Sequence, residues 1–185
     1  LPISVSAHVE INGASKLFDF TMYGEDDRAL GSMQTRLREV SPDEMAQFKG
    51  CAFPANMDKR DMIWAWSQPF TATSVQAYLA LAQDPNPIHT SDDAARLAGL
   101  AGAVVPGMFL AGVAELMLLQ ALSDSAVANM KLRFMAPVLI GQALRFGVLV
   151  RSKTPSGQPK VVRIFVVRAD SIIAAIADVP LQVPT

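Results

Sequence analysis

The first forty residues of the chain alternate between apolar and polar positions. Over residues 3–11 the apolar side chains fall at every second position, which is the period of a strand with one buried face. Asn12-Gly13 is typical of a hairpin turn, and we expect further strands over residues 16–23 and 28–40. The pattern therefore predicts a β-rich N-terminal region.

A short helix is expected next, and after it comes a segment without a clear period. The run from Ser41 to Glu44 is typical of a helix start, with Ser41 as the N-cap and Pro42 at the first helical position. We expect this helix to end near Gly50. Residues 51–67 show neither a helical nor a strand period, so we interpret them as a connector.

From residue 68 onward the pattern predicts helices first and strands afterwards. Three helices are expected, over about residues 75–83, 91–100 and 107–122. Four strands are expected after them, over residues 128–137, 142–152, 160–169 and 171–183. The last helix is almost wholly apolar, and an antiparallel sheet wrapped around it would bury both elements. The sequence therefore predicts an α+β domain.

The composition narrows the classes of partner. Apolar residues make up 51% of the chain, which indicates an extensive core, a buried oligomer interface, or both. The 16 basic and 17 acidic residues nearly cancel and form no basic stripe, so we expect no nucleic acid partner. The apolar helix over residues 107–122 would span only about 24 Å, short of a bilayer core of about 30 Å, so we expect no membrane span. Cys51 is the only cysteine, and a reducing, cytoplasmic location is expected.

The candidate chemistry lies in the loop between two predicted helices. Asp84 and His89 are separated by two prolines, each of which holds the residue before it extended, so the acid and the imidazole sit on a stiffened loop. A carboxylate and a neutral imidazole held in this way can deprotonate one water and then return a proton. The alternative is an ordinary turn capped by Asp84 and Asn86, with His89 as a core residue.

A second candidate group is the start of the apolar helix at Gly107. The first N–H groups of a helix are unpaired, and the helix dipole there favours negative charge. The Gly107 N–H can therefore stabilise the oxyanion that develops on a substrate carbonyl.

These segments together resemble the MaoC-like dehydratases, the (R)-specific enoyl-CoA hydratases of the hot-dog fold. The resemblance lies in the D-x-N-P-x-H run that begins at Asp84 and in the V-x-G-M run that begins at Val105. Residues 131–142 are similar to the F-x-x-P-V-x-x-G-D segment of the family. The likeness covers about residues 68–183.

The resemblance implies both a fold and an activity. The fold is a hot-dog, an antiparallel sheet around a long central helix, over residues 68–185, with residues 1–67 as a β-rich extension or a degenerate second hot-dog. The activity is (R)-specific hydration of trans-2-enoyl thioesters, or the reverse dehydration of 3-hydroxyacyl thioesters. The substrate would be an acyl-CoA or acyl-ACP thioester. A homodimer or higher homo-oligomer joined through the sheet is expected.

The resemblance also implies roles for individual residues. Asp84 and His89 would be the catalytic pair, and Gly107 would donate its N–H to the thioester carbonyl. Three residues are expected to contact the substrate: Asn86, which would also brace the loop, Pro106 and Met108. No cofactor and no metal are expected, because the two histidines of the chain lack metal-ligand spacing.

Two other functions stay open at this point. A hot-dog thioesterase would use a carboxylate on the central helix, and Glu115 lies on the helix expected to take that place. The chain could instead be a non-catalytic subunit that binds acyl thioesters within a hetero-oligomer.

Overall fold

The structure is a computed structural model, and it describes residues 4–57, 62–123 and 125–182. It divides into two compact units, Leu1–Ser41 and Pro42–Thr185. The segment after Ser41 contributes two strands, within residues 51–66, to the sheet of the second unit.

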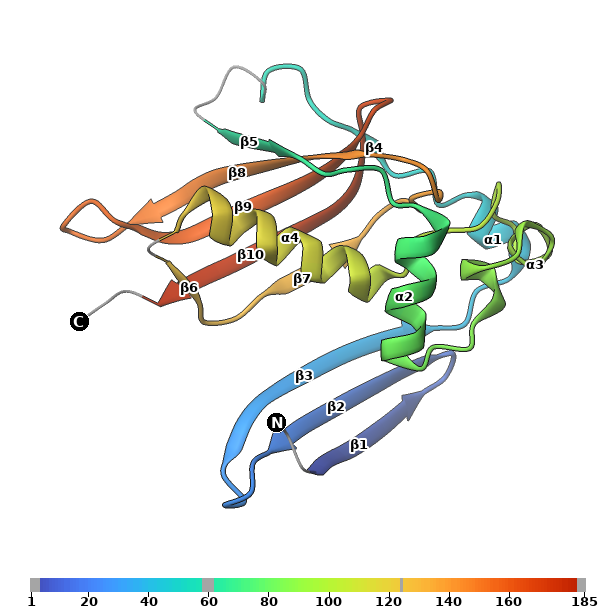
Figure 1. Ribbon diagram of the computed structural model, residues 1–185, viewed down its shortest axis with the longest axis horizontal. Helices are drawn as coiled ribbons and strands as arrows, with labels where there is room; N and C mark the ends of the chain where they lie inside the picture. Colours follow the sequence, from blue (N-terminus) through green and yellow to red (C-terminus); the bar gives the residue numbers. More distant parts are fainter. Residues whose placement is uncertain (1–3, 58–61, 124, 183–185) are drawn as a thin grey trace. The chain divides into compact units, whose positions relative to one another are not determined.

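The first unit is a three-stranded antiparallel sheet. Its strands, blue in Figure 1, lie in the order β1 (Ser4–Asn12), β2 (Ser15–Tyr23) and β3 (Ala29–Arg38). Gly13 has φ 59°, the left-handed conformation that the predicted hairpin turn requires. The three strands expected from the alternation are confirmed, apart from Ile3, which lies outside the described residues.

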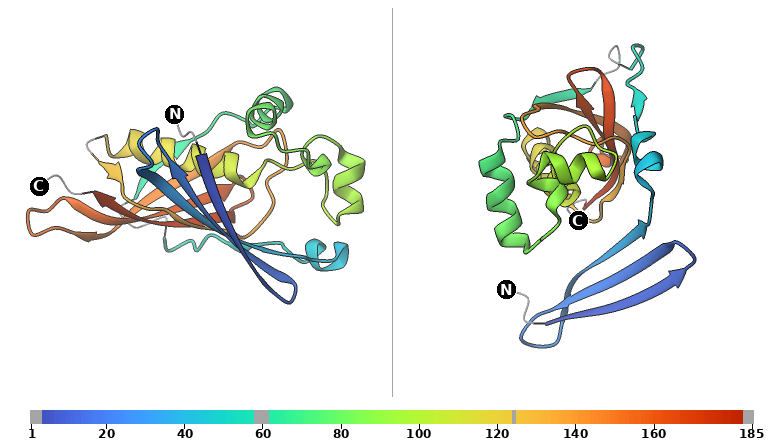
Figure 2. Two further views of the ribbon diagram at one scale, coloured as in Figure 1. Left: turned by 90° about the horizontal axis from the view of Figure 1, so that it is seen from below. Right: turned by 90° about the vertical axis from the view of Figure 1, so that its right-hand side faces the viewer.

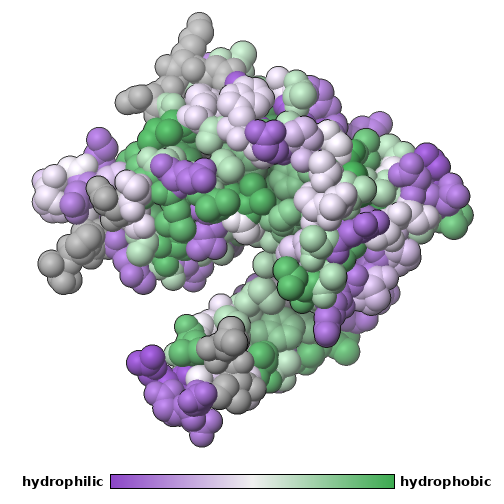
Figure 3. Space-filling model, in the orientation of Figure 1, coloured by the Kyte–Doolittle hydropathy of each residue, from purple (hydrophilic) through white to green (hydrophobic). Residues whose placement is uncertain are grey.

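The alternation places apolar side chains of all three strands on one face of this sheet. Ala7 pairs with Phe20, and Phe20 pairs with Met33 on the other side. No helix lies within residues 4–41, and none of these described residues is buried. Hydrophobic side chains are accordingly visible along this sheet in Figure 3.

The second unit holds the other elements. In chain order they are α1 (Pro42–Ala46), β4 (Cys51–Ala52), β5 (Ile63–Trp66), α2 (Ala72–Ala82), the 3-10 helix η1 (Pro87–His89), α3 (Asp92–Leu97), α4 (Gly107–Ala121), β6 (Ala126–Val127), β7 (Lys131–Phe134), β8 (Leu144–Lys153), β9 (Pro159–Arg168) and β10 (Ile172–Gln182). The strands form an antiparallel sheet in the order β4-β10-β9-β8-β5, and β6 and β7 pair with β10. The expected helices and the strands expected over residues 142–152 and 160–169 are present. The strand expected over residues 128–137 is shorter, since β7 covers only Lys131–Phe134. The expected end of the last strand, Val183, lies outside the described residues.

The core of this unit lies between α4 and the inner face of the sheet. Leu110, Ala114 and Leu118 recur at helical spacing on α4 and are buried. They pack in one cluster with fully buried sheet residues such as Phe146 and Ile164. Figure 2 shows the strands curving around the helix. The predicted α+β hot-dog fold is confirmed. No helix in the described part of the chain is long and apolar enough to cross a membrane.

The interpretation of residues 51–67 as a connector is wrong, because the described part of this segment contains β4 and β5 and packs on the outer face of the sheet. β5 pairs with β8, and Phe53 lies in edge-to-face contact with both Trp64 and Phe165, at 5.5 and 5.4 Å between ring centroids. The Arg145 guanidinium lies 4.0 Å from the Trp64 ring centroid. With four residues, β5 is too short for its period to be recognised in the sequence.

Candidate active site

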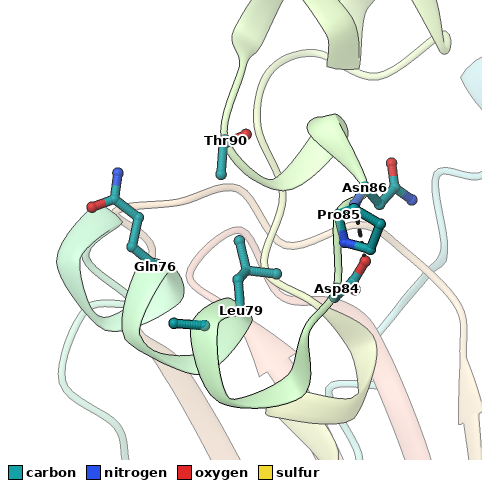
Figure 4. Close-up of a pocket in the computed structure, with 7 residues that line it drawn as sticks. Gln76, Leu79, Asp84, Pro85, Asn86 and Thr90 are labelled. Carbon is teal, nitrogen blue, oxygen red and sulfur yellow. Dashed lines mark hydrogen bonds between the residues drawn. The ribbon is translucent and has the colours of Figure 1, made fainter.

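The loop after α2 is shaped by its own side chains. α2 ends where Gln83 adopts the left-handed conformation, with φ 51°. Asp84 Oδ1 then accepts a hydrogen bond from the Asn86 N–H at 3.0 Å, the dashed line in Figure 4. Asn86 Oδ1 in turn accepts one from the Ile88 N–H at 3.3 Å. Asp84 and Asn86 therefore cap successive turns of the loop that leads to His89.

This loop brings Asp84 and His89 together. His89 Nε2 lies 3.7 Å from Asp84 Oδ2. The His89 side chain is buried, and its Nδ1 lies 2.8 Å from the Val104 carbonyl oxygen. Because a carbonyl oxygen can only accept, Nδ1 carries the proton, and Nε2 of the neutral ring is left as an acceptor. A water about 2.8 Å from both Nε2 and Oδ2 can therefore donate a hydrogen bond to each group.

A short extended segment before α4 ties the loop to the helix. The Val104 N–H donates to the Ile88 carbonyl at 3.1 Å, while the carbonyl of Val104 accepts from His89. On its other side, the Val105 N–H donates to the Val138 carbonyl at 2.8 Å. The imidazole and the start of α4 are therefore held by one backbone segment.

The start of α4 carries the three other predicted residues. Buried Pro106 is the N-cap, and it provides no capping side chain for the first turn. Gly107 is half-buried and Met108 is exposed. Because no side chain caps the first helical N–H groups of α4, these groups are available to a ligand. A Cβ atom placed on Gly107 would lie 2.9 Å from the ring of Phe134, a contact that the sequence did not reveal.

A hollow of about 360 Å³ opens beside the loop that follows α2. It is lined by Gln76, Leu79 and Ala80 of α2 and by Asp84, Pro85, Asn86 and Thr90 of the loop (Figure 4). The structure therefore brings Asp84 and Asn86 to this hollow. Pro106, Gly107 and Met108 are not part of its lining and lie at the start of α4 instead.

Tyr78 of α2 is a polar group that interacts electrostatically with Asp84. Its ring stacks on Phe109 of α4, with 4.9 Å between the centroids. Burial raises the pKa of the Tyr78 hydroxyl, and the negative charge of Asp84 raises it further. The phenol therefore keeps its proton at neutral pH and remains a hydrogen-bond donor.

The carboxylate of a thioesterase and a metal site are the two other kinds of site to consider. Glu115 is exposed on α4, about 12 Å along the helix axis from Gly107. Among the described residues, no group of three or more His, Cys, Asp or Glu side chains could hold a metal ion.

Comparison with known proteins identifies the family. Residues 59–170 match the model of the MaoC like domain. The chain belongs to the MaoC-like domain family. None of the curated proteins matches it.

Solved structures of MaoC-like proteins share the fold at low sequence identity. The (R)-hydratase from A. caviae involved in PHA biosynthesis is 23% identical, with a TM-score of 0.58, over 67% of this chain and 95% of that one. The ChsH1-ChsH2 complex from Mycobacterium tuberculosis is 14% identical, with a TM-score of 0.55, over 73% and 97%. A MaoC-like dehydratase from Phytophthora capsici is 14% identical, with a TM-score of 0.69, over 98% of this chain and 64% of that one. The likeness to the first two thus covers about two thirds to three quarters of this chain, while the third extends over nearly the whole chain.

Proposed function

We propose that this protein hydrates trans-2-enoyl thioesters with (R) specificity and catalyses the reverse dehydration of 3-hydroxyacyl thioesters. The observation that carries the proposal is the Asp84–His89 pair, 3.7 Å apart, with the imidazole buried and anchored through Nδ1. Two acceptors fixed at this separation can hold one water and take its proton. Membership of the MaoC-like family supports the same reaction class.

The proposed reaction adds one water across the conjugated double bond. The water oxygen forms a bond to C3 while Asp84 and His89 take up the proton, and the electron pair of the double bond moves toward the thioester oxygen. The Gly107 N–H stabilises this oxyanion at the start of α4. The proton then returns to C2, which completes the 3-hydroxyacyl thioester. Dehydration follows the same steps in reverse.

The substrate we propose is an acyl-CoA or acyl-ACP thioester, with Asn86, Pro106 and Met108 in contact with it. An (R)-hydratase and the ChsH1-ChsH2 complex are among the proteins of similar fold.

We also propose that the chain forms at least a homodimer. β5 lies at the edge of the sheet, where Ile63 is 42% and Trp66 66% exposed, and such edges are usually covered. Light scattering that gives the mass of a single 19.9 kDa chain would refute this part of the proposal.

The reaction is tested with trans-2-enoyl-CoA substrates of four and eight carbons. Loss of the conjugated thioester absorbance reports hydration, and chiral analysis of the product reports its configuration. Asp84→Asn and His89→Ala should each lower kcat/KM at least about a hundredfold. The double variant should be little slower than either single variant, because the two groups act as one unit. Near-normal hydration by either single variant would refute the proposal, and release of free CoA without hydration would identify a thioesterase instead.

A further inference from the structure

Phe134 is an aromatic residue that lies against the start of α4 and has no role in the mechanism above. It is the last residue of β7 and pairs with Ala175 of β10. Ala175 is fully buried in the core cluster that includes α4, so the Phe134 side chain lies on the same face of the sheet as that helix. Phe134 nevertheless remains 45% exposed. The residue is therefore at the margin of the core, where a ligand can reach it.

The ring of Phe134 packs against Gly107. A Cβ atom built on Gly107 would lie 2.9, 3.1 and 3.3 Å from three of its ring atoms. The Cα–Cβ bond of a helical residue tilts toward the N-terminus of the helix, and the free N–H groups of the first turn point the same way. The ring thus borders the space in front of those N–H groups.

Backbone hydrogen bonds hold the segment that carries Phe134 against β10 and against the start of α4. The N–H groups that follow Phe134, on Met135 and Ala136, both donate to the Ala174 carbonyl of β10, at 2.8 and 3.2 Å. A little further on, the Val138 carbonyl accepts from Val105, just before Gly107. Phe134 and Gly107 therefore lie on two segments whose backbones are bonded to each other, which keeps the attachment point of the ring beside the start of α4.

We propose that Phe134 determines specificity by excluding thioesters that carry a substituent on C2. The proposal rests on the hydratase function and on the role of the Gly107 N–H proposed above. C2 is bonded directly to the carbonyl carbon, so an oxygen that accepts from Gly107 brings the groups on C2 close to the Phe134 ring. A hydrogen on C2 fits beside the ring, whereas a methyl group requires the ring to move.

The test compares two substrates, trans-2-butenoyl-CoA and its analogue with a methyl group on C2, trans-2-methyl-2-butenoyl-CoA. The wild type should prefer the unbranched substrate at least about tenfold in kcat/KM, the scale of one excluded methyl group. Phe134→Ala should reduce this preference at least about fivefold by improving turnover of the branched substrate. Phe48→Ala is the matched control, since Phe48 is 43% exposed and follows α1, and it should leave the preference unchanged.

Each outcome decides the proposal. An unchanged preference in a folded Phe134→Ala protein overturns it, and circular dichroism checks the fold. If that variant does not fold, Phe134→Leu keeps an apolar side chain in β7 and should show a smaller shift in the same direction; no shift overturns the proposal. If the wild type hydrates no trans-2-enoyl-CoA of four or eight carbons, the hydratase function fails. Calorimetry with butanoyl-CoA and 2-methylbutanoyl-CoA then tests Phe134 alone: equal binding of both, or of neither, overturns its role.

Discussion

The two sheets of this protein share an alternating pattern but differ in what covers their apolar faces. In the second unit α4 covers the inner face, and Val162, Ile164 and Val166 of β9 are completely buried. In the first unit no helix lies within residues 4–41, and Ile11 and Leu37 are 71% and 54% exposed. Alternation thus determines which face of a sheet is apolar, while burial of that face requires a second layer.

Two acid–imidazole pairs, one in each unit, differ in the same way in how far they are buried. His8 Nε2 lies 3.8 Å from Glu10 Oε1 in the first unit, nearly the distance between His89 and Asp84 in the second. The side chains of His8 and Glu10 are 72% and 65% exposed, whereas that of His89 is 10% exposed and bonded to the Val104 carbonyl. A short distance does not by itself make a catalytic site, because catalytic groups must also be held in a fixed position, as burial and the bond to Val104 hold His89.

The largest expected effect on stability compares two leucines. Leu118 on α4 is completely buried, so Leu118→Ala should lower the free energy of unfolding by about 3 kcal/mol, through lost burial and the cavity left behind. Leu37 on β3 is 54% exposed, and Leu37→Ala should cost less than about 0.5 kcal/mol. Urea titration of both variants measures the difference. Equal losses would mean that the first sheet is covered as well as the second.

Hydrogen exchange compares the central strands of the two sheets. β9 lies between β8 and β10 and packs against α4. β2 lies between β1 and β3, and no helix lies within the described residues 4–41. We expect amides of β9 to exchange at least about a hundredfold more slowly than those of β2, because a sheet without a second layer opens locally. Mass spectrometry of short peptides measures both rates. Similar protection in the two strands would contradict the conclusion that the first sheet lacks a second layer.

The sequence predicted most elements and indicated the candidate site residues, but not the contacts between distant segments. Alternation located β1 to β3, and two prolines in the loop made Asp84 and His89 candidates. β5 was missed because a four-residue strand has too few positions to display a period. The packing of Phe134 on Gly107 was missed because it depends on the pairing of two segments far apart in the chain, which periodicity does not encode.

The smallest expected effect compares one ion pair in each sheet. Hydrogen bonding to Arg163 lowers the pKa of Asp178, so the pair contributes stability above the pKa of the unfolded carboxyl and loses it as pH falls through the folded pKa. Both side chains are partly exposed, so Asp178→Asn should cost only about 0.5 kcal/mol at pH 7, and less in acid. Glu39→Gln, which breaks the more exposed pair with Lys16, should cost nothing measurable. Urea titrations at pH 7 and pH 3 check both variants. A stability loss in Asp178→Asn that is larger at pH 3 than at pH 7 would contradict the lowered pKa of Asp178.

The two histidines provide the most direct test of the catalytic claim. The measurement is the hydration rate of a four-carbon trans-2-enoyl-CoA by His89→Ala and by His8→Ala, with folding of each variant checked by circular dichroism. We expect His89→Ala to lower kcat/KM at least about a hundredfold, because it removes an anchored acceptor for the reacting water. His8→Ala should keep the wild-type rate, because the exposed His8–Glu10 pair has no such role. A folded His89→Ala protein that hydrates the substrate at the wild-type rate would contradict the account.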